Sequence, residues 1–136
     1  MDSRTGSCLC GGVTYKLKSD IKNSINCHCN FCRSQSGAAY SSYAIVPEND
    51  FEIETGEKMV KCYEIEEGKK YFCSNCGTPI FSKNNKFTDT CMIYLGTLNG
   101  CNDITPRRNV WYENKLEWVD KLSSIKSINQ GIGRRA

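Results

Sequence analysis

The chain has 136 residues, 18 of them basic and 15 acidic, and a net charge of +3. This length fits a single domain over residues 1–136, with a core at about 6–120 and a C-terminal tail at 121–136, and so mild a charge argues against nucleic acid as a partner. Because no apolar run approaches the roughly 20 residues that span a bilayer, and residues 1–10 lack the apolar region of a secretory signal, we expect a cytoplasmic protein that does not enter a membrane.

Short apolar runs rich in β-forming residues recur along the chain, separated by turn residues such as Gly56 and Gly68. The runs predicted as strands are VTYKL at 13–17, AYSSYAIV at 39–46, FEIE at 51–54, VKCYEI at 60–65, YFC at 71–73, PIF at 79–81, CMIYLG at 91–96 and NVWYE at 109–113. FEIE and VKCYEI alternate as half-buried strands do. Only Leu116, Val119 and Leu122 suggest a helical turn or two. The chain is predicted to be mainly β, with short antiparallel strands that carry metal-binding loops.

Ten cysteines are an unusual load for this length. In a secreted protein an even number suggests disulfides, but without a signal peptide we expect a reducing compartment, where such density indicates metal binding or catalysis. Cysteines one or two residues apart bridge each other poorly and suit chelation. The pattern therefore favours metal over disulfides.

The stretch FCSNCG at 72–77 has the spacing of a zinc knuckle. Cys73 and Cys76 can converge on one ion, and Gly77 lets the backbone turn its amides toward the sulfurs. The other half of a tetrahedral site is predicted in CLC at 8–10, whose two thiols share a side if the segment is extended. Four thiolates make a closed, structural site that joins the N-terminal strand to a distant hairpin. The alternative, a redox dithiol, lacks its usual βαβ context.

The run NCHCNFCRSQSG at 26–37 brings Cys27, Cys29 and Cys32 within six residues. Three thiolates in so short a loop can form a tripod on one face of an ion, and without a fourth protein ligand zinc keeps a position open, as in catalytic sites. Such a site favours a soft ligand, above all a thiol, whose pKa the ion would lower. His28, the only histidine, is a candidate ligand, general base or neighbour, and we favour a neighbour that supports the ligands.

The sequence also allows other interpretations of this three-cysteine group. A fourth thiol from Cys62, Cys91 or Cys101 would close the site and make it structural; otherwise these three are expected to be buried as small apolar residues. An iron–sulfur cluster is a further alternative, although such clusters use four thiolates. The aromatic residues expected in the core rather than on a substrate platform are Tyr40, Tyr43, Trp111 and Trp118.

In this order, CLCGGVTY, CHCNFCRSQSGAAY, YFCSNCGTPIF and the late GTLN…W run resemble the glutathione-dependent formaldehyde-activating enzyme family, whose domain is shared with centromere protein V. The resemblance covers residues near 7 to 118. It implies an Mss4-like fold of several small antiparallel sheets organised around zinc. It also implies two Zn²⁺ ions per chain, a structural one held by Cys8, Cys10, Cys73 and Cys76 and a catalytic one held by Cys27, Cys29 and Cys32.

The activity implied by this resemblance is that of a carbon–sulfur lyase similar to S-(hydroxymethyl)glutathione synthase, with glutathione as co-substrate and formaldehyde as the prototype aldehyde. Two positions depart from the family pattern. Asn99 follows GTL where members often carry Asp, and Asn109 precedes the later aromatic strand where they often carry His. Both cysteine sites are intact, so the departures bear on the substrate rather than on the metal.

The mechanism expected from the tripod begins when a small-molecule thiol binds there and loses its proton, after which the thiolate attacks an aldehyde. Arg33 and Gln35, with Ser34 and Ser36, are candidates for holding a carboxylate or amide of glutathione. The alternative function is a non-enzymatic zinc-binding module that presents its sheet to a protein partner.

Overall fold

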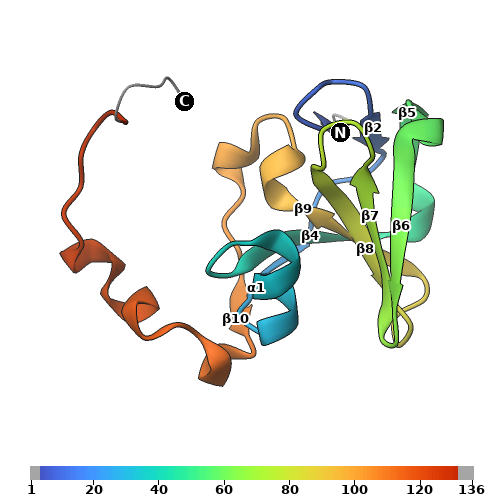
Figure 1. Ribbon diagram of the computed structural model, residues 1–136. Coiled ribbons are helices and arrows are strands. Elements are labelled where there is room, and N and C mark those ends of the chain that lie inside the picture. The colour runs from blue at the N-terminus through green and yellow to red at the C-terminus, as the bar shows by residue number, and fades with distance from the viewer. Residues whose placement is uncertain (1–3, 132–136) are drawn as a thin grey trace.

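The computed structural model describes residues 4–131, which form two β-sheets and a few short helices (Figure 1). The strands are β1 (Arg4–Ser7), β2 (Thr14–Leu17), β3 (Asn23–Cys27), β4 (Ser41–Pro47), β5 (Phe51–Thr55), β6 (Val60–Ile65), β7 (Gly68–Cys73), β8 (Pro79–Asn84), β9 (Thr90–Tyr94) and β10 (Arg108–Val110). The helices are α1 (Asn30–Ser36) and the 3₁₀ segments η1 (Glu48–Asp50), η2 (Glu57–Met59), η3 (Leu95–Thr97), η4 (Cys101–Asp103), η5 (Tyr112–Asn114) and η6 (Glu117–Ser124). The mainly β prediction is confirmed. None of the helices in this part of the chain is long and apolar enough to cross a membrane.

The small sheet has the order β1-β2-β5 and the large one the order β10-β3-β4-β9-β8-β7-β6. All neighbours in the two sheets pair antiparallel except β10 and β3, which run parallel. In β2 the pattern that defines the strand is plain: Tyr15 and Leu17 are buried while Thr14 and Lys16 are partly exposed. The period of two lets one face of the small sheet cover the large sheet.

Two apolar clusters hold the sheets together. The larger joins Tyr15 and Leu17 of the small sheet to Val46, Ile80 and Ile93 of the large one. The smaller cluster lies under the three-cysteine run and contains Ile25, Tyr43 and Tyr94 together with Cys27 and Cys32. The candidate tripod therefore stands on a packed apolar base, which restricts the positions of its thiols.

Strands β1 and β3 and helix α1 were not predicted from the sequence pattern. The sequences RTGS and NSINC contain almost no apolar alternation, and α1 has only seven residues, too few for a helical period to show. The prediction that β6 is half-buried is wrong, because Lys61–Glu64 are all exposed. As the last strand of its sheet, β6 pairs only with β7 and has a solvent-facing edge.

The C-terminal segment, residues 112–131, follows β10 and runs away from the sheets in Figure 1. Its predicted helical turns are present as η6 (Glu117–Ser124), but none of the residues of η6 is fully buried, and Leu122 stays 46% exposed. The prediction of core aromatic residues is confirmed for Tyr43, which is fully buried. It is wrong for Trp111 and Trp118, which are 61% and 42% exposed because they precede and begin this outlying segment.

Candidate metal centres and the adjoining pocket

The three-cysteine run lies where β3 meets α1. Cys27 is the last residue of β3, Cys29 is the N-cap of α1, and Cys32 lies within the helix. The backbone N–H of Cys32 donates to the Sγ of Cys29 at 3.3 Å, which satisfies an amide that the helix start leaves unpaired. The predicted loop is thus a strand–cap–helix junction, and the cap holds the Cys29 thiol beside the other two.

The three sulfurs lie within 4.8 Å of one another, and those of Cys27 and Cys29 are 3.5 Å apart. Zinc–sulfur bonds of about 2.3 Å in a tetrahedron place neighbouring sulfurs about 3.8 Å apart. The donor set therefore fits three corners of a zinc site. Within residues 4–131 no fourth Cys, His, Asp or Glu side chain joins this group. The arrangement suits an ion that keeps one position for an outside ligand.

None of the three cysteines considered as a fourth ligand closes this group. Cys91 is buried in the larger core and Cys101 is partly buried against it, whereas Cys62 is exposed on β6. The prediction of buried apolar residues is confirmed for Cys91 and wrong for Cys62, because β6 is an edge strand with a solvated face.

His28 is buried between the rings of Tyr40 and Tyr112, whose centroids lie 4.8 and 5.1 Å from its own. Its Nε2 lies 3.1 Å from Oδ1 of Asn109, an oxygen that accepts the ring N–H. Its backbone N–H donates to the carbonyl of Val110, which ties β10 to the tripod segment. His28 therefore neighbours the tripod without joining its donor group, and one of the two residues that depart from the family pattern, Asn109, is its hydrogen-bond partner. The other, Asn99, bonds Thr5 of β1.

A line of hydroxyl groups runs from the tripod to helix α1. The Tyr43 hydroxyl lies 3.4 Å from Sγ of Cys32 and donates to the Tyr94 hydroxyl at 3.5 Å. The Tyr94 hydroxyl donates in turn to Oε1 of Gln35. All three side chains lie on α1, β4 or β9, so the large sheet and the helix together build this connection.

Hydrogen bonds distribute charge unevenly among the tripod thiols. The contact with Cys27 is the main cause that lowers the pKa of Cys32 to about 5, and the charge of Lys70 acts in the same direction. The same contact, with burial, raises the pKa of Cys27 above its usual value. Cys32 is therefore the sulfur of this pair that holds negative charge most readily.

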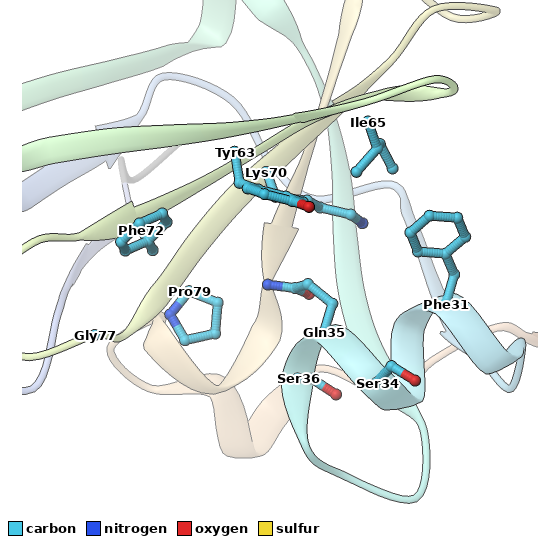
Figure 2. A pocket seen from close by; sticks show the side chains of 10 residues that line it. All are labelled: Phe31, Ser34, Gln35, Ser36, Tyr63, Ile65, Lys70, Phe72, Gly77 and Pro79. Atoms are coloured by element: carbon cyan, nitrogen blue, oxygen red, sulfur yellow. The ribbon is translucent and has the colours of Figure 1, made fainter.

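A pocket of about 510 Å³ opens between α1 and the strands β6, β7 and β8 (Figure 2). Its lining residues are Phe31, Ser34, Gln35, Ser36, Tyr63, Ile65, Lys70, Phe72, Gly77 and Pro79. Four of them, Phe31, Ser34, Gln35 and Ser36, lie on α1 within four positions of Cys32, and Gly77 directly follows Cys76. The pocket is thus bordered by both cysteine-bearing segments, and its size falls in the range of small-molecule sites.

The two residues predicted to hold glutathione occupy different surroundings. Gln35 lines the pocket together with Ser34 and Ser36. Arg33 does not; its guanidinium donates to the backbone carbonyls of His28 and Asn114 at 2.7 and 2.6 Å and to the side chain of Asn30. These acceptors tie the start of the C-terminal segment to the tripod. Binding of glutathione by Arg33 stays a prediction that no observation here tests.

Two residues near the tripod, Lys70 and Tyr94, are not identified by the sequence pattern. Lys70 follows Lys69 in a pair that the sequence alone does not distinguish from solvated surface, yet it lines the pocket and its charge lowers the pKa of Cys32. Tyr94 was only one residue of a predicted strand. Neither has a local signal, since sheet pairing with other strands brings β7 to the pocket and places Tyr94 of β9 against Gln35.

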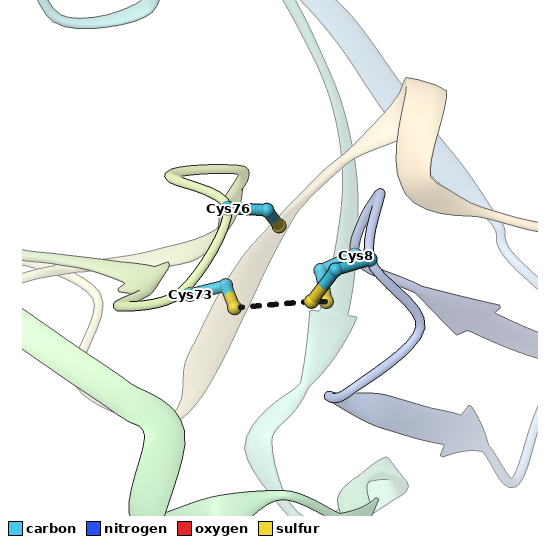
Figure 3. A group of neighbouring side chains, drawn as sticks. Cys8, Cys73 and Cys76 are labelled. Carbon is cyan, nitrogen blue, oxygen red and sulfur yellow. Dashed lines mark hydrogen bonds between the residues drawn. The ribbon is translucent and has the colours of Figure 1, made fainter.

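The second cluster joins the turn after β1 to the turn between β7 and β8. In Figure 3 Cys73 and Cys76 face Cys8 across the gap between these turns. All four sulfurs, including that of Cys10, lie within 4.8 Å of one another. The sulfurs of Cys8 and Cys10 are 3.6 Å apart, and those of Cys10 and Cys73 are 3.9 Å apart. These values bracket the roughly 3.8 Å of a tetrahedral zinc site with four sulfur ligands.

Both halves of this cluster are tight turns with a glycine after the second cysteine. Gly77 has φ +78° and donates its N–H to the Cys73 carbonyl, and Gly11 has φ +76° and donates to the Cys8 carbonyl. A side chain would disfavour this backbone conformation. The expectation that CLC at 8–10 is extended is therefore wrong, because the chain turns there between β1 and β2; the two thiols still converge.

Two sulfurs of this cluster accept hydrogen bonds from neighbouring backbone and side-chain groups. The backbone N–H of Val13 donates to Sγ of Cys8 at 3.3 Å. The Thr78 hydroxyl accepts from the N–H of Leu9 at 3.1 Å, which leaves its own proton for Sγ of Cys76, 3.1 Å away. This contact is the main cause that lowers the pKa of Cys76 to about 5. All ten cysteines are free thiols, in agreement with metal rather than disulfides.

Comparison with known proteins agrees with this geometry. Residues 3–114 match the family described as glutathione-dependent formaldehyde-activating enzyme. The chain belongs to this family. The resemblance seen in the three cysteine motifs is thereby confirmed over most of the sequence.

Two individual proteins are similar to the chain. A Podospora anserina protein, named provisionally as a glutathione-dependent formaldehyde-activating enzyme, is 27% identical over 85 residues, which cover 60% of this chain. The match spans only 40% of that relative's length. The crystal structure of a Rhodobacter sphaeroides protein superposes with a TM-score of 0.62 at 21% identity, covering 77% of this chain and 98% of the other. At that identity the likeness concerns the fold.

Proposed function

We propose that the protein is a zinc-dependent carbon–sulfur lyase that acts on a glutathione–aldehyde adduct, similar to S-(hydroxymethyl)glutathione synthase. The observation that carries this proposal is the group of three thiols without a fourth protein ligand, placed beside a pocket of small-molecule size. Family membership supports glutathione and formaldehyde as the reactants. In this proposal the whole chain acts as one domain, and its free thiols suit the reducing cytoplasm.

Two zinc ions have separate tasks in this proposal. Cys8, Cys10, Cys73 and Cys76 would hold a structural ion, since four thiolates leave no position for substrate. Cys27, Cys29 and Cys32 would hold the catalytic ion. Zinc bound there would supply Lewis acidity and lower the pKa of a thiol brought beside it.

The residues around the tripod position the reactants. The pocket, with apolar walls and the polar groups of Gln35 and Lys70, would hold the peptide part of glutathione so that its sulfur lies near Cys32. In the forward direction the thiolate forms a carbon–sulfur bond to the aldehyde carbon. The carbonyl π electrons pass to the oxygen, which takes up the proton that the thiol lost. In the reverse direction the same bond breaks and the aldehyde is released.

The test compares the rate of adduct exchange with and without the zinc-loaded protein. Glutathione and formaldehyde also combine without a catalyst, so magnetisation-exchange NMR at equilibrium measures the acceleration over this background. We expect Cys29→Ser to lose the acceleration and Cys62→Ser, which changes an exposed thiol outside both clusters, to keep it. Unchanged catalysis by zinc-loaded Cys29→Ser would overturn the proposal.

A non-enzymatic zinc-binding interaction module is the competing function. It is favoured by the exposed side chains of Trp118, Leu122, Ile125 and Ile128, since several large apolar groups exposed in one segment are typical of contact surfaces. The two functions differ in what thiols do. The enzyme predicts that glutathione changes the coordination of one zinc ion, visible by X-ray absorption, whereas the module predicts two ions that glutathione leaves unchanged.

A further inference from the structure

The pocket beside the tripod contains one positive charge. Lys70 is the only ionisable Lys, Arg, Asp, Glu or His among its lining residues, and the walls around it are mainly apolar or aromatic. Its ammonium lies 5.8 Å from the centroid of the Tyr43 ring. Within residues 4–131 no carboxylate forms an ion pair with it, in contrast to Lys83 of β8, which pairs with Glu48 of η1. A cation in an apolar recess favours an anionic ligand, because water screens it less there.

The second polar group of the pocket is the amide of Gln35, and its orientation follows from its neighbour. Tyr43 donates its proton to the Tyr94 oxygen, so the Tyr94 proton remains for Oε1 of Gln35. The amide oxygen is thereby used on the side of the sheet, and Nε2 with its two N–H groups is left for the pocket. Figure 2 shows this nitrogen pointing from α1 toward the space between Lys70 and Pro79.

We propose that Lys70 and the amide nitrogen of Gln35 together bind a carboxylate of the thiol substrate, and that Tyr94 is a positioning residue that keeps the amide turned the right way. This inference rests on the proposed function for the identity of the ligand. It narrows the substrate class to thiols that carry a carboxylate some distance from the sulfur. Gln35 lies one helical turn beyond Cys32, so a ligand anchored by its carboxylate extends along α1 and places its sulfur at the tripod.

The role of Tyr94 follows from what an amide would do without it. A free glutamine side chain presents its oxygen and its nitrogen about equally, and an amide oxygen beside a carboxylate is repulsive. Tyr94 is 7% exposed and belongs to the smaller core cluster, so packing holds the position of its side chain. It thus excludes the wrong orientation at no cost to the ligand on binding.

The experiment measures binding alone, with S-methylglutathione as the probe, because its capped sulfur removes the reaction. Calorimetry compares this probe with two derivatives, one amidated at the glycine carboxylate and one at the glutamyl α-carboxylate. In the zinc-loaded wild type we expect one amide to bind on the order of 10-fold more weakly than the acid. Lys70→Met should abolish this preference, whereas Lys69→Met, a neighbour exposed on β7, should retain it.

Gln35→Glu should lower the affinity for S-methylglutathione on the order of 10-fold or more, because it replaces a hydrogen-bond donor with a negative charge. Tyr94→Phe should reduce the ratio of acid to amide affinity several-fold, and Tyr71→Phe, which alters a ring stacked on Phe81, should leave the ratio unchanged. A general structural defect would weaken acid and amide equally, so the ratio separates positioning from damage.

Three results would overturn the inference: equal binding of the acid and both amides, equal loss in Lys70→Met and Lys69→Met, or no binding of the probe to the wild type. Each of these leaves the exchange assay with glutathione and formaldehyde free to succeed, so the inference can fail while the proposed function stands. If the wild type accelerated the reaction of no thiol but still bound the acid more tightly than one amide, the proposed function alone would be overturned.

Discussion

The four-cysteine cluster should contribute more to stability than the tripod, because it joins segments that are far apart in the chain. Cys10 and Cys73 lie 63 positions apart and meet at 3.9 Å. If zinc cross-links them, the chain-entropy model used for disulfides gives about 4 kcal/mol of stabilisation for a closed loop of that length. The tripod closes a loop of only a few residues, for which the same model gives about 2 kcal/mol.

The double variant Cys10→Ser/Cys76→Ser tests this difference. Cys10 is exposed and Cys76 partly exposed, so the substitutions remove one ligand from each turn with little loss of packing. We expect the free energy of unfolding of the zinc-loaded protein to fall by about 4 kcal/mol, a large part of the 5–15 kcal/mol typical of a domain. Cys29→Ser should cost about half as much by the same model.

Urea unfolding followed by tryptophan fluorescence measures these changes, with zinc content determined for each variant. Cys62→Ser serves as the matched control and should unfold like the wild type, because its thiol is exposed and belongs to neither cluster. If the double variant lost one zinc ion per chain yet unfolded at the wild-type urea concentration, the idea that the metal cross-link stabilises the fold would be refuted. An equal loss in Cys29→Ser would refute the loop-length argument.

Further predictions concern the core, the free thiols and the metal content. Gly6→Ala should lower the free energy of unfolding by about 1–3 kcal/mol, since the added Cβ would lie 2.3 Å from the Tyr15 ring and 2.6 Å from a backbone oxygen. The control is Gly96→Ala, whose Cβ would meet nothing within 4 Å; a thermal melt should show a loss for Gly6→Ala and none for Gly96→Ala. Iodoacetamide should modify the exposed Cys62 well before Cys91, because Cys91 is buried and its burial raises its pKa to about 11. Mass spectrometry at pH 8 and 9 should find Cys91 unmodified in the folded protein. Early labelling of Cys91 would contradict its burial. Protein purified without chelator should contain two zinc ions per chain. A chelator should first remove the ion at Cys27, Cys29 and Cys32, because three thiolates hold an ion less firmly than four. Simultaneous loss of both ions would argue against two different sites.

Much of the fold was predictable because its strands carry their own signal. Every predicted strand overlaps an observed one, since β-branched and aromatic residues between turn signals indicate a strand without knowledge of its partner. The strands that were missed, β1 and β3, owe their conformation to pairing with β2 and β4. The exposure of β6 likewise depends on its place at the edge of the large sheet, which its alternating sequence does not reveal.

The sequence by itself determined the chemistry of the two cysteine groups. Spacing places Cys73 near Cys76, and Cys27 near Cys29 and Cys32, because only a few backbone torsions separate them. Only the tertiary structure decided that the CLC turn meets the distant knuckle, that no fourth ligand reaches the tripod, and that Lys70 and Tyr94 lie beside it. The physical reason is that these relations arise from sheet pairing and packing between segments far apart in the chain, and no local pattern records them.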